Sequence, residues 1–404
     1  MRVGKAVEIL EKLVGFDTTS RNSNLALIGW VEDYLTSLGI HHERIGGADP
    51  TKANLWATIG PADRPGYILS GHTDVVPVDG QTWRSDPFRL TDRGGRLHGR
   101  GTTDMKGFLA CCLAAVPDMV AAGLAVPIHL AFSYDEEVGC LGVRDLVARL
   151  QHYSVRPLGC FVGEPTEMRV VGGHKGKRSL RVTVHGRSCH SALAPRGINA
   201  VEYAARLIAR IAEDSSRRGA EGPFDREYEV PFTTGHTGLV HGGAALNIVP
   251  DLCTFEFELR SIPADDPDLL VEEIKTYARD RLEPGMKAVA PEAGFSFELK
   301  SGFPGLDLSP EAELAGLARR LSGSSDHKKV PFGTEAGLFA AAGIPAVVIG
   351  PGSIDRAHRA DEFITLTELD DCGVFLDRLI ATCGPASAAA SASAAALGPR
   401  SPSY

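Results

Sequence analysis

Histidine and carboxylate side chains at a few separated positions are the strongest candidates for chemistry in this sequence. The candidates are His72, Asp104, the adjacent acids Glu136 and Glu137, Glu164 and His358. Two imidazoles and three carboxylates can hold two divalent cations if one carboxylate bridges them, and one glutamate of the adjacent pair is then free to act as a base. Two close metal ions and a base turn water into a nucleophile at neutral pH. The pattern therefore indicates metal-assisted attack on a carbonyl group.

Each candidate also has an ordinary structural interpretation. Asp104 could cap a helix that starts at Met105, which is a common role for aspartate. The run of acids around Glu136 could be a solvated loop, and His358 could be a surface residue. In favour of a metal ligand, Asp74 follows His72 closely, and a metal-bound imidazole needs a partner on its second ring nitrogen.

The elements that must position these residues alternate between strands and helices over roughly the first 175 residues. Short apolar runs predict buried strands at 67–70, 128–133 and 159–162, and longer Ala- and Leu-rich runs predict helices at 105–122 and 141–150. This alternation is typical of an α/β domain with a largely parallel sheet flanked by helices. Ligands of such sheets gather beyond the carboxyl ends of the strands, where three of the candidate segments fall.

The pattern of apolar and polar residues changes near residue 179. Alternating runs at 180–185, 254–260 and 295–299, with a helix at 199–214, predict two helices on one face of a four-stranded antiparallel sheet. The α/β texture returns after residue 309, with helices at 310–321, 335–342 and 366–382 and a strand at 346–349. The expected fold is thus a discontinuous α/β catalytic domain (1–178 and 302–384) with an inserted α+β domain (179–301). The Ala- and Ser-rich tail, 385–404, is expected to be disordered.

Composition narrows the class of protein. A chain of 404 residues with 43% hydrophobic and 23% charged residues is typical of a globular protein. Its net charge of −9 argues against nucleic acid or a membrane surface as the main partner. The eight cysteines form no C-x-x-C pair and no signal peptide precedes the first helix, so we expect reduced thiols and a cytoplasmic location. There is no Walker A, H-E-x-x-H or G-x-S-x-G motif.

Together these segments resemble the M20 family of di-zinc amidohydrolases and peptidases, from about residue 5 to 382. Within it the chain is most similar to the bacterial acetylornithine deacetylases. The resemblance is carried by the segments 72–80, 163–166, 174–176, 332–337 and 350–354.

The resemblance implies a role for each candidate. Asp104 would bridge two zinc ions, with cobalt as a possible substitute. His72 and Glu164 would complete one metal site, and Glu137 and His358 the other. Glu136 would be the general base and Asp74 would orient His72.

The resemblance also implies residues that contact the substrate. His190 of the inserted dimerisation or lid domain would reach the active site of the neighbouring subunit in a homodimer. Arg260 would hold the substrate's α-carboxylate, with Asn247 nearby, and Glu335 would meet a side-chain ammonium. Without the resemblance, His190 could equally be a hairpin-loop residue, Arg260 a solvated strand end and Glu335 a helix-start acid.

The implied reaction is metal-dependent hydrolysis of N²-acetyl-L-ornithine to L-ornithine and acetate, a step of arginine biosynthesis. The alternatives are another N-acyl amino acid hydrolase of the family, such as a succinyl-diaminopimelate desuccinylase or an acetylcitrulline deacetylase, and a non-catalytic dimeric binding protein. The intact ligand set and Glu136 argue against the last of these.

Overall fold

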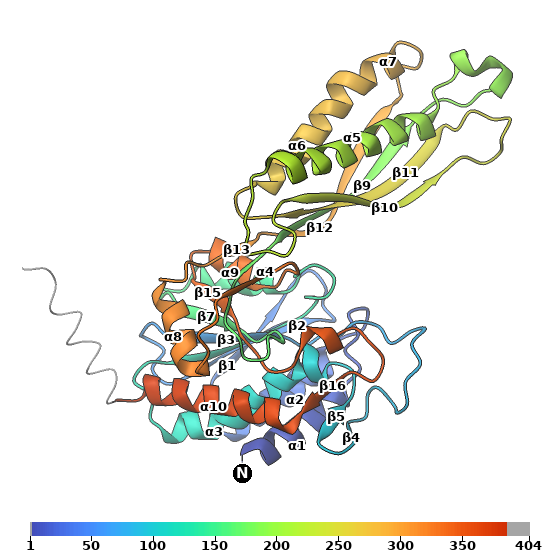
Figure 1. Ribbon diagram of the computed structural model, residues 1–404. Coiled ribbons are helices and arrows are strands. Elements are labelled where there is room, and N and C mark those ends of the chain that lie inside the picture. Colours follow the sequence, from blue (N-terminus) through green and yellow to red (C-terminus); the bar gives the residue numbers. More distant parts are fainter. Residues whose placement is uncertain (1, 386–404) are drawn as a thin grey trace, which may run out of the picture. The chain divides into compact units, whose positions relative to one another are not determined.

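The computed structural model describes residues 2–385, which divide into two compact units (Figure 1). Within these residues the first unit runs to Gly173, resumes for Leu308–Lys328 and resumes again at Thr334. The second unit comprises His174–Asp307 and Lys329–Gly333, so it begins before the expected residue 179 and ends after the expected residue 301. The expected tail, 385–404, lies outside the described residues except for its first position. No helix within 2–385 is long and apolar enough to cross a membrane.

A nine-stranded mixed sheet lies mostly in the first unit, although its residues 174, 306–307 and 329–330 fall within the ranges of the second. Its order is β1-β2-β6-β3-β7-β15-β8-β13, and β14 pairs with β8 beside this path. The strands are β1 (His42–Gly46), β2 (Ala53–Ile59), β3 (Tyr67–His72), β6 (Ile128–Ser133), β7 (Gly159–Val162), β8 (Val171–His174), β13 (Leu306–Asp307), β14 (Lys328–Val330) and β15 (Ala346–Val348). The central strands β6, β3, β7 and β15 are parallel, which confirms the predicted architecture.

Helices cover both faces of this sheet. One face carries a large apolar core shared by α1 (Arg2–Val14), α2 (Leu25–Ser37), α3 (Gly107–Ala121), α8 (Glu313–Ser322) and α10 (Leu366–Cys383). The short helices α4 (Val143–Leu150) and α9 (Ala336–Ala341) pack against each other and against the sheet. A small three-stranded sheet of β4 (Thr91–Asp92), β5 (Arg96–His98) and β16 (Phe363–Thr365) and a 3-10 turn at Ile354–Arg356 complete the unit.

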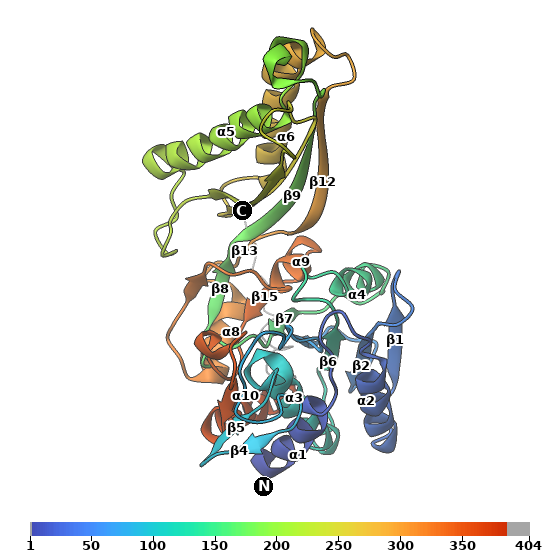
Figure 2. The same cartoon turned by 90° about the vertical axis from the view of Figure 1, so that its right-hand side faces the viewer.

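The second unit is a four-stranded antiparallel sheet in the order β10-β11-β9-β12. Its strands are β9 (Gly176–His185), β10 (Thr234–Gly242), β11 (Leu252–Ser261) and β12 (Gly294–Phe303). The long helices α5 (Ala200–Glu221) and α6 (Pro267–Tyr277) lie on the same face of this sheet, as predicted (Figure 2). Short turns at Ser191–Arg196 and Ala278–Leu282 and the helix α7 (Glu283–Lys287) join these elements.

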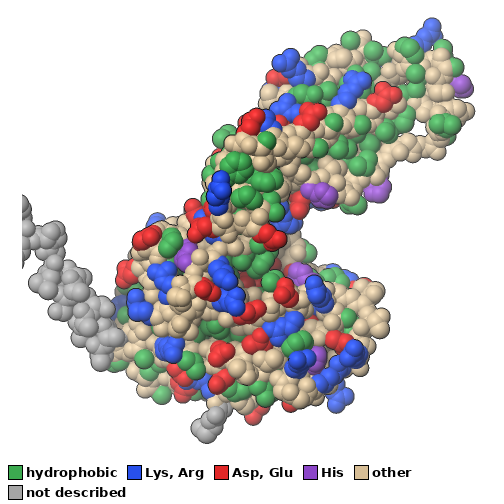
Figure 3. Space-filling model, in the orientation of Figure 1, with side chains coloured by type: hydrophobic (Ala, Val, Ile, Leu, Met, Phe, Trp, Pro, Cys, Tyr) green, Lys and Arg blue, Asp and Glu red, His purple; other side chains and the backbone are tan. Residues whose placement is uncertain are grey.

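Apolar and polar residues alternate along β11, so one face of the four-stranded sheet is apolar and packs against the helices. In β11 every second residue from Cys253 to Leu259 is buried beneath the helices, whereas the intervening residues reach the surface. The outer strand β10 lacks this regularity, and its Leu239 and Val240 are half exposed. Exposed hydrophobic side chains are visible on the second unit in Figure 3.

Candidate metal centre

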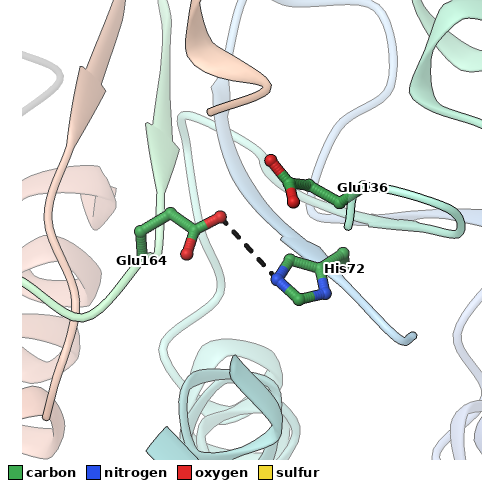
Figure 4. A group of neighbouring side chains, drawn as sticks. All are labelled: His72, Glu136 and Glu164. Carbon is green, nitrogen blue, oxygen red and sulfur yellow. Dashed lines mark ion pairs between the residues drawn. The ribbon is translucent and has the colours of Figure 1, made fainter. Parts of the chain in front are cut away.

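The parallel strands bring three of the candidate segments to one edge of the sheet. His72 is the last residue of β3 and is paired with Ser133, the last residue of β6. Glu136 and Glu137 follow β6, and Glu164 follows β7 on the other side of β3. Because parallel strands end at the same edge, residues far apart in the sequence converge there. Figure 4 shows His72, Glu136 and Glu164 directed toward one another.

Asp104 enters from a sharp turn instead of a helix. The turn Thr102–Lys106 precedes α3, and Asp104 in it has non-helical backbone angles (φ −125°, ψ 90°). The helix starts at Gly107, so the alternative interpretation of Asp104 as its N-cap is wrong. The irregular backbone leaves the carboxylate free to face the other candidates.

The two oxygens of Asp104 divide the candidate ligands into two groups. Its Oδ1 lies 3.0 Å from Nε2 of His72, which is itself 3.7 Å from Oε1 of Glu164. Its Oδ2 lies 3.2 Å from Nε2 of His358, which is 3.1 Å from Oε2 of Glu137. A carboxylate whose two oxygens each lie beside a different histidine is suited to bridge two metal ions.

Hydrogen bonding fixes the imidazole of His72. Its Nδ1 lies 2.9 Å from the backbone carbonyl of Asp74 and 3.5 Å from the Asp74 carboxylate. A proton on Nδ1 that is donated to this carbonyl leaves the lone pair of Nε2 for a metal ion. The Asp74 carboxylate accepts hydrogen bonds from Ser20 Oγ (2.7 Å) and from the backbone N–H of Glu136 (3.1 Å). Asp74 therefore links the His72 strand to the loop that carries the glutamate pair.

The adjacent glutamates have different surroundings. Glu137 contacts His358, and its second oxygen, Oε1, is buried without a hydrogen-bond partner among the described residues. Both glutamates lie near His72: Glu137 is grouped there with Asp104, and Glu136 with Glu164, in two sets that could each hold a metal ion. Oε1 of Glu136 also accepts a hydrogen bond from the Cys140 thiol at 3.2 Å. Thus Glu137 has the environment of a ligand with one oxygen still unsatisfied, and Glu136 borders the space beside the His72 group.

The charge balance of the cluster favours bound cations. Burial and the Asp104 carboxylate raise the pKa of Glu137 to about 7. Burial also raises the pKa of Glu164, again with a contribution from Asp104. Hydrogen bonds to Asp104 and Glu137 raise the pKa of the His358 imidazole to about 10. Without metal, the excess negative charge is thus offset by protons. Divalent cations would supply the same compensation, and nitrogen and oxygen donors suit zinc, cobalt and manganese.

A buried glutamate that sequence reasoning missed holds the Asp104 turn in place. Oε1 of Glu362 accepts hydrogen bonds from the backbone N–H groups of Thr103 (2.9 Å) and Asp104 (3.1 Å). Its Oε2 accepts from Gly101 N (3.0 Å) and from Nη1 of Arg100 (2.7 Å). The acid lies four residues after His358, but nothing in the sequence connects it to a turn some 260 residues earlier. Its carboxylate therefore joins the two segments that carry Asp104 and His358.

Replacing Glu362 with glutamine is expected to weaken metal binding as well as folding. The amide has one acceptor oxygen for four N–H donors. It also deprives Arg100 of its carboxylate partner at a place where both side chains are only 1% exposed. Breaking such a pair costs about 3–5 kcal/mol of unfolding free energy. Chemical denaturation and a metal titration of the folded protein measure the two effects.

Glu368 offers a matched control for this variant. It pairs with Arg356 and caps α10 in the same part of the chain, but it does not contact the Asp104 turn. Glu368→Gln should lower stability and leave metal affinity unchanged. Equal metal affinity in Glu362→Gln and the unaltered protein would mean that Glu362 only stabilises the fold.

Glu335 lies beneath the same edge of the sheet. Its side chain is 1% exposed and accepts hydrogen bonds from Ser133 Oγ and, at 3.4 Å, from Ser70 Oγ. Burial raises its pKa to about 7, although the Ser133 hydrogen bond opposes this. Its carboxylate is thus engaged by two strand-end hydroxyls, and a contact with a substrate ammonium stays a prediction.

The remaining candidates belong to the second unit. His190 and Asn247 are both exposed and lie on neighbouring segments, because Ser191 N donates to the Asn247 carbonyl at 2.9 Å. Arg260 is paired with Glu258 through two hydrogen bonds of 3.1 and 3.2 Å. A substrate carboxylate would have to compete with Glu258 for this guanidinium, and the roles of all three residues stay predictions.

Comparison with known proteins gives consistent results for sequence and structure. The family model for peptidase family M20/M25/M40 matches residues 68–382. The chain is 34% identical over 387 residues to an acetylornithine deacetylase of Myxococcus xanthus, covering 93% of this chain and 97% of that protein. It is 32% identical to an acetylornithine deacetylase of Pasteurella multocida, covering 89% and 91% of the two chains.

Among solved structures, an M20 family metallo-carboxypeptidase of Sulfolobus solfataricus matches with a TM-score of 0.73 at 16% identity, covering 93% of this chain and 98% of that one. A dinuclear metal-binding M20 peptidase of Bacillus subtilis matches with a TM-score of 0.62 at 14% identity, covering 95% and 98%. At these identities the structures support the fold alone.

Proposed function

The chain belongs to peptidase family M20/M25/M40, and on this premise we propose that it is an acetylornithine deacetylase. The proposed reaction is hydrolysis of N²-acetyl-L-ornithine to L-ornithine and acetate, in the cytoplasm, as a step of arginine biosynthesis. The choice of substrate rests on identities of 32–34% to two acetylornithine deacetylases, over about nine-tenths of this chain and of each relative. The convergence of His72, Asp104 and His358 at one sheet edge supports the choice of chemistry.

In this proposal the cluster holds two zinc ions, for which cobalt can substitute. Asp104 is the bridging ligand, His72 and Glu164 complete one site, and Glu137 and His358 complete the other. Two such ions lower the pKa of a water molecule and withdraw electron density from an acyl carbonyl. The unpaired Oε1 of Glu137 and the divided contacts of Asp104 support this assignment.

Glu136 carries the proton transfers. It lies beside His72 and Glu164, where its carboxylate can accept a proton from the attacking water. The same carboxyl group then donates that proton to the amine nitrogen as the acyl C–N bond breaks. The carbonyl carbon leaves as acetate and the amine as ornithine, so Glu136 returns to its starting state. Asp74 holds the backbone of Glu136 in place throughout.

The second unit contributes substrate contacts and the subunit interface of a homodimer. Two features support association through this unit. β10 is an edge strand, and an unpaired strand edge readily adds another strand. The apolar side chains of Leu239 and Val240 on β10 are also exposed. In this unit, His190 would stabilise the oxyanion, and Arg260 and Asn247 would contact the substrate's carboxylate end. Glu335, in the first unit, would meet the substrate's ammonium. Arg260 can pair with a carboxylate through two hydrogen bonds, as it does with Glu258.

Turnover of a small substrate panel tests this proposal. We expect the highest kcat/KM for N²-acetyl-L-ornithine, and lower values for N-acetylcitrulline, N-succinyl-diaminopimelate and N-acetylmethionine. Acetylcitrulline lacks the ammonium, so a buried acid that meets this group would be left unpaired. A higher kcat/KM for the succinyl or citrulline substrate would replace the proposed substrate and leave the chemistry standing.

Metal removal is the control for the panel. Dialysis against a chelator should abolish hydrolysis of every substrate, and added Zn²⁺ or Co²⁺ should restore it, because the ligands hold the ions non-covalently. Full activity in a sample shown to be metal-free by elemental analysis would contradict the metal mechanism itself.

A further inference from the structure

A cavity of about 600 Å³ lies at the edge of the sheet opposite to the metal centre. Its lining includes Gly66, just before β3, and His129, near the start of β6. The metal-centre candidates follow the other ends of these same strands. His129 and Ser133 are four residues apart on β6, or roughly 13 Å at the usual rise of a strand. The cavity is therefore separate from the catalytic edge, and its volume is in the range of small-molecule sites.

Aromatic rings form one side of the cavity. Trp56 is stacked on His129 with ring centroids 4.7 Å apart, and Tyr153 meets Trp56 edge-on at 5.9 Å. Arg149 lies over the Tyr153 ring at 5.7 Å from its centroid. Because Trp56 is only 5% exposed, a flat ligand ring would meet mainly the Tyr153 side of this cluster.

The charged residues around the cavity favour an anion. Glu43 is its one acidic lining residue, and it is already bound by Arg149 at 3.1 Å and by the Tyr153 hydroxyl at 3.0 Å. Arg64, a further lining residue, is exposed and forms no ion pair with any described residue. The cavity thus has a free guanidinium and no free carboxylate.

A ring nitrogen without a hydrogen-bond partner among the described residues also borders this space. His129 is 8% exposed, and its Nδ1 lies 3.0 Å from Oγ1 of Thr58. Its Nε2 has no hydrogen-bond partner among residues 2–385, and burial lowers the pKa of the ring to about 4, so the ring is neutral. A side chain at Gly66 would come within 2.9 Å of this nitrogen. The glycine therefore keeps Nε2 open, and a ligand atom can pair with it.

We infer that this cavity binds a small anion with a planar ring, the chemistry shared by nucleoside monophosphates and aromatic carboxylates. The ring packs on the aromatic side, the anionic group pairs with Arg64, and a polar ring atom meets Nε2 of His129. This binding does not depend on the proposed deacetylase activity, because none of the three contacts involves a residue of the metal centre.

Calorimetric titration of the metal-loaded protein tests the site. Two probes represent the two ligand classes: AMP is a nucleoside monophosphate and anthranilate is an aromatic carboxylate. Adenosine and inorganic phosphate, the two halves of AMP, are titrated separately. We expect AMP or anthranilate to bind, and the one that binds more tightly identifies which of the two ligand classes the cavity takes. Adenosine and phosphate should each bind at least about tenfold more weakly than AMP if AMP is the ligand, since each lacks one of the paired contacts.

Arg64→Glu should weaken binding of the preferred probe by at least about tenfold, because it places a negative charge opposite the anion. Arg320→Glu, an equally exposed charge reversal on α8, should leave binding unchanged and thereby excludes a general effect of net charge. Both variants should keep the thermal stability of the unaltered protein. Unchanged binding in Arg64→Glu, or no binding of either probe at about 1 mM, would overturn the inference.

Discussion

Glu136→Ala is expected to lower kcat by about 10²–10⁴-fold or more while both metal ions stay bound, because a general base contributes a factor of this size. The expectation follows from the position of the side chain. Glu136 lies beside His72 and Glu164, but it does not share the His358 contact that Glu137 makes. Steady-state kinetics and elemental analysis of the same purified sample measure turnover and metal content together.

Glu137→Ala is the matched control, since the two residues are neighbours of the same type. Its removal takes away the carboxylate that contacts His358 and frees one metal position. We expect about one metal equivalent to be lost from Glu137→Ala and none from Glu136→Ala. The reverse result, with a metal ion missing from Glu136→Ala, would show that the roles of the two glutamates are exchanged.

Buried strands of the first unit could be predicted where the sequence has a short, continuous apolar run. The strands at 128–133 and 159–162 were predicted at the residues where β6 and β7 occur. Strand β10 was not predicted, since its residues are mostly exposed and no apolar alternation marks it. The start of α3 was predicted two residues early, at Met105, because neither Met105 nor Lys106 breaks a helical pattern. The backbone at Asp104 and Met105 is nevertheless not helical.

The residues of the candidate site could likewise be predicted from the sequence only in part. Residues at strand ends, such as His72 and Glu164, could be found because the parallel sheet fixes where its carboxyl edge lies. The grouping of Asp104 with His358 could not be derived from spacing, since the two segments meet only in the folded chain. The same holds for Glu362, whose carboxylate is bound by backbone groups of the Asp104 turn. Long-range contacts of this kind leave no local pattern in a single sequence.

His190→Ala is expected to reduce turnover by about 10²–10³-fold, with a smaller change in KM, which is the usual effect of losing one oxyanion donor. Within the second unit, His190 is exposed, and its Nδ1 accepts a hydrogen bond from the backbone N–H of Ala192 at 3.1 Å. A neutral imidazole that accepts at Nδ1 carries its proton on Nε2. The exposed ring is therefore oriented as an Nε2 donor, and the variant should keep the metal content and the oligomeric state of the unaltered protein.

A mixing experiment tests whether this donor acts across the proposed homodimer. When His190→Ala chains are combined with Glu136→Ala chains, a heterodimer contains one site with Glu136 from one chain and His190 from the other, so activity should return. Mass-tagged chains first establish that subunits exchange. As a control, His190→Ala chains mixed with chains that carry both substitutions can form no complete site and should stay inactive. If heterodimers form in the first mixture and turnover stays at the level of the single variants, His190 does not act in trans.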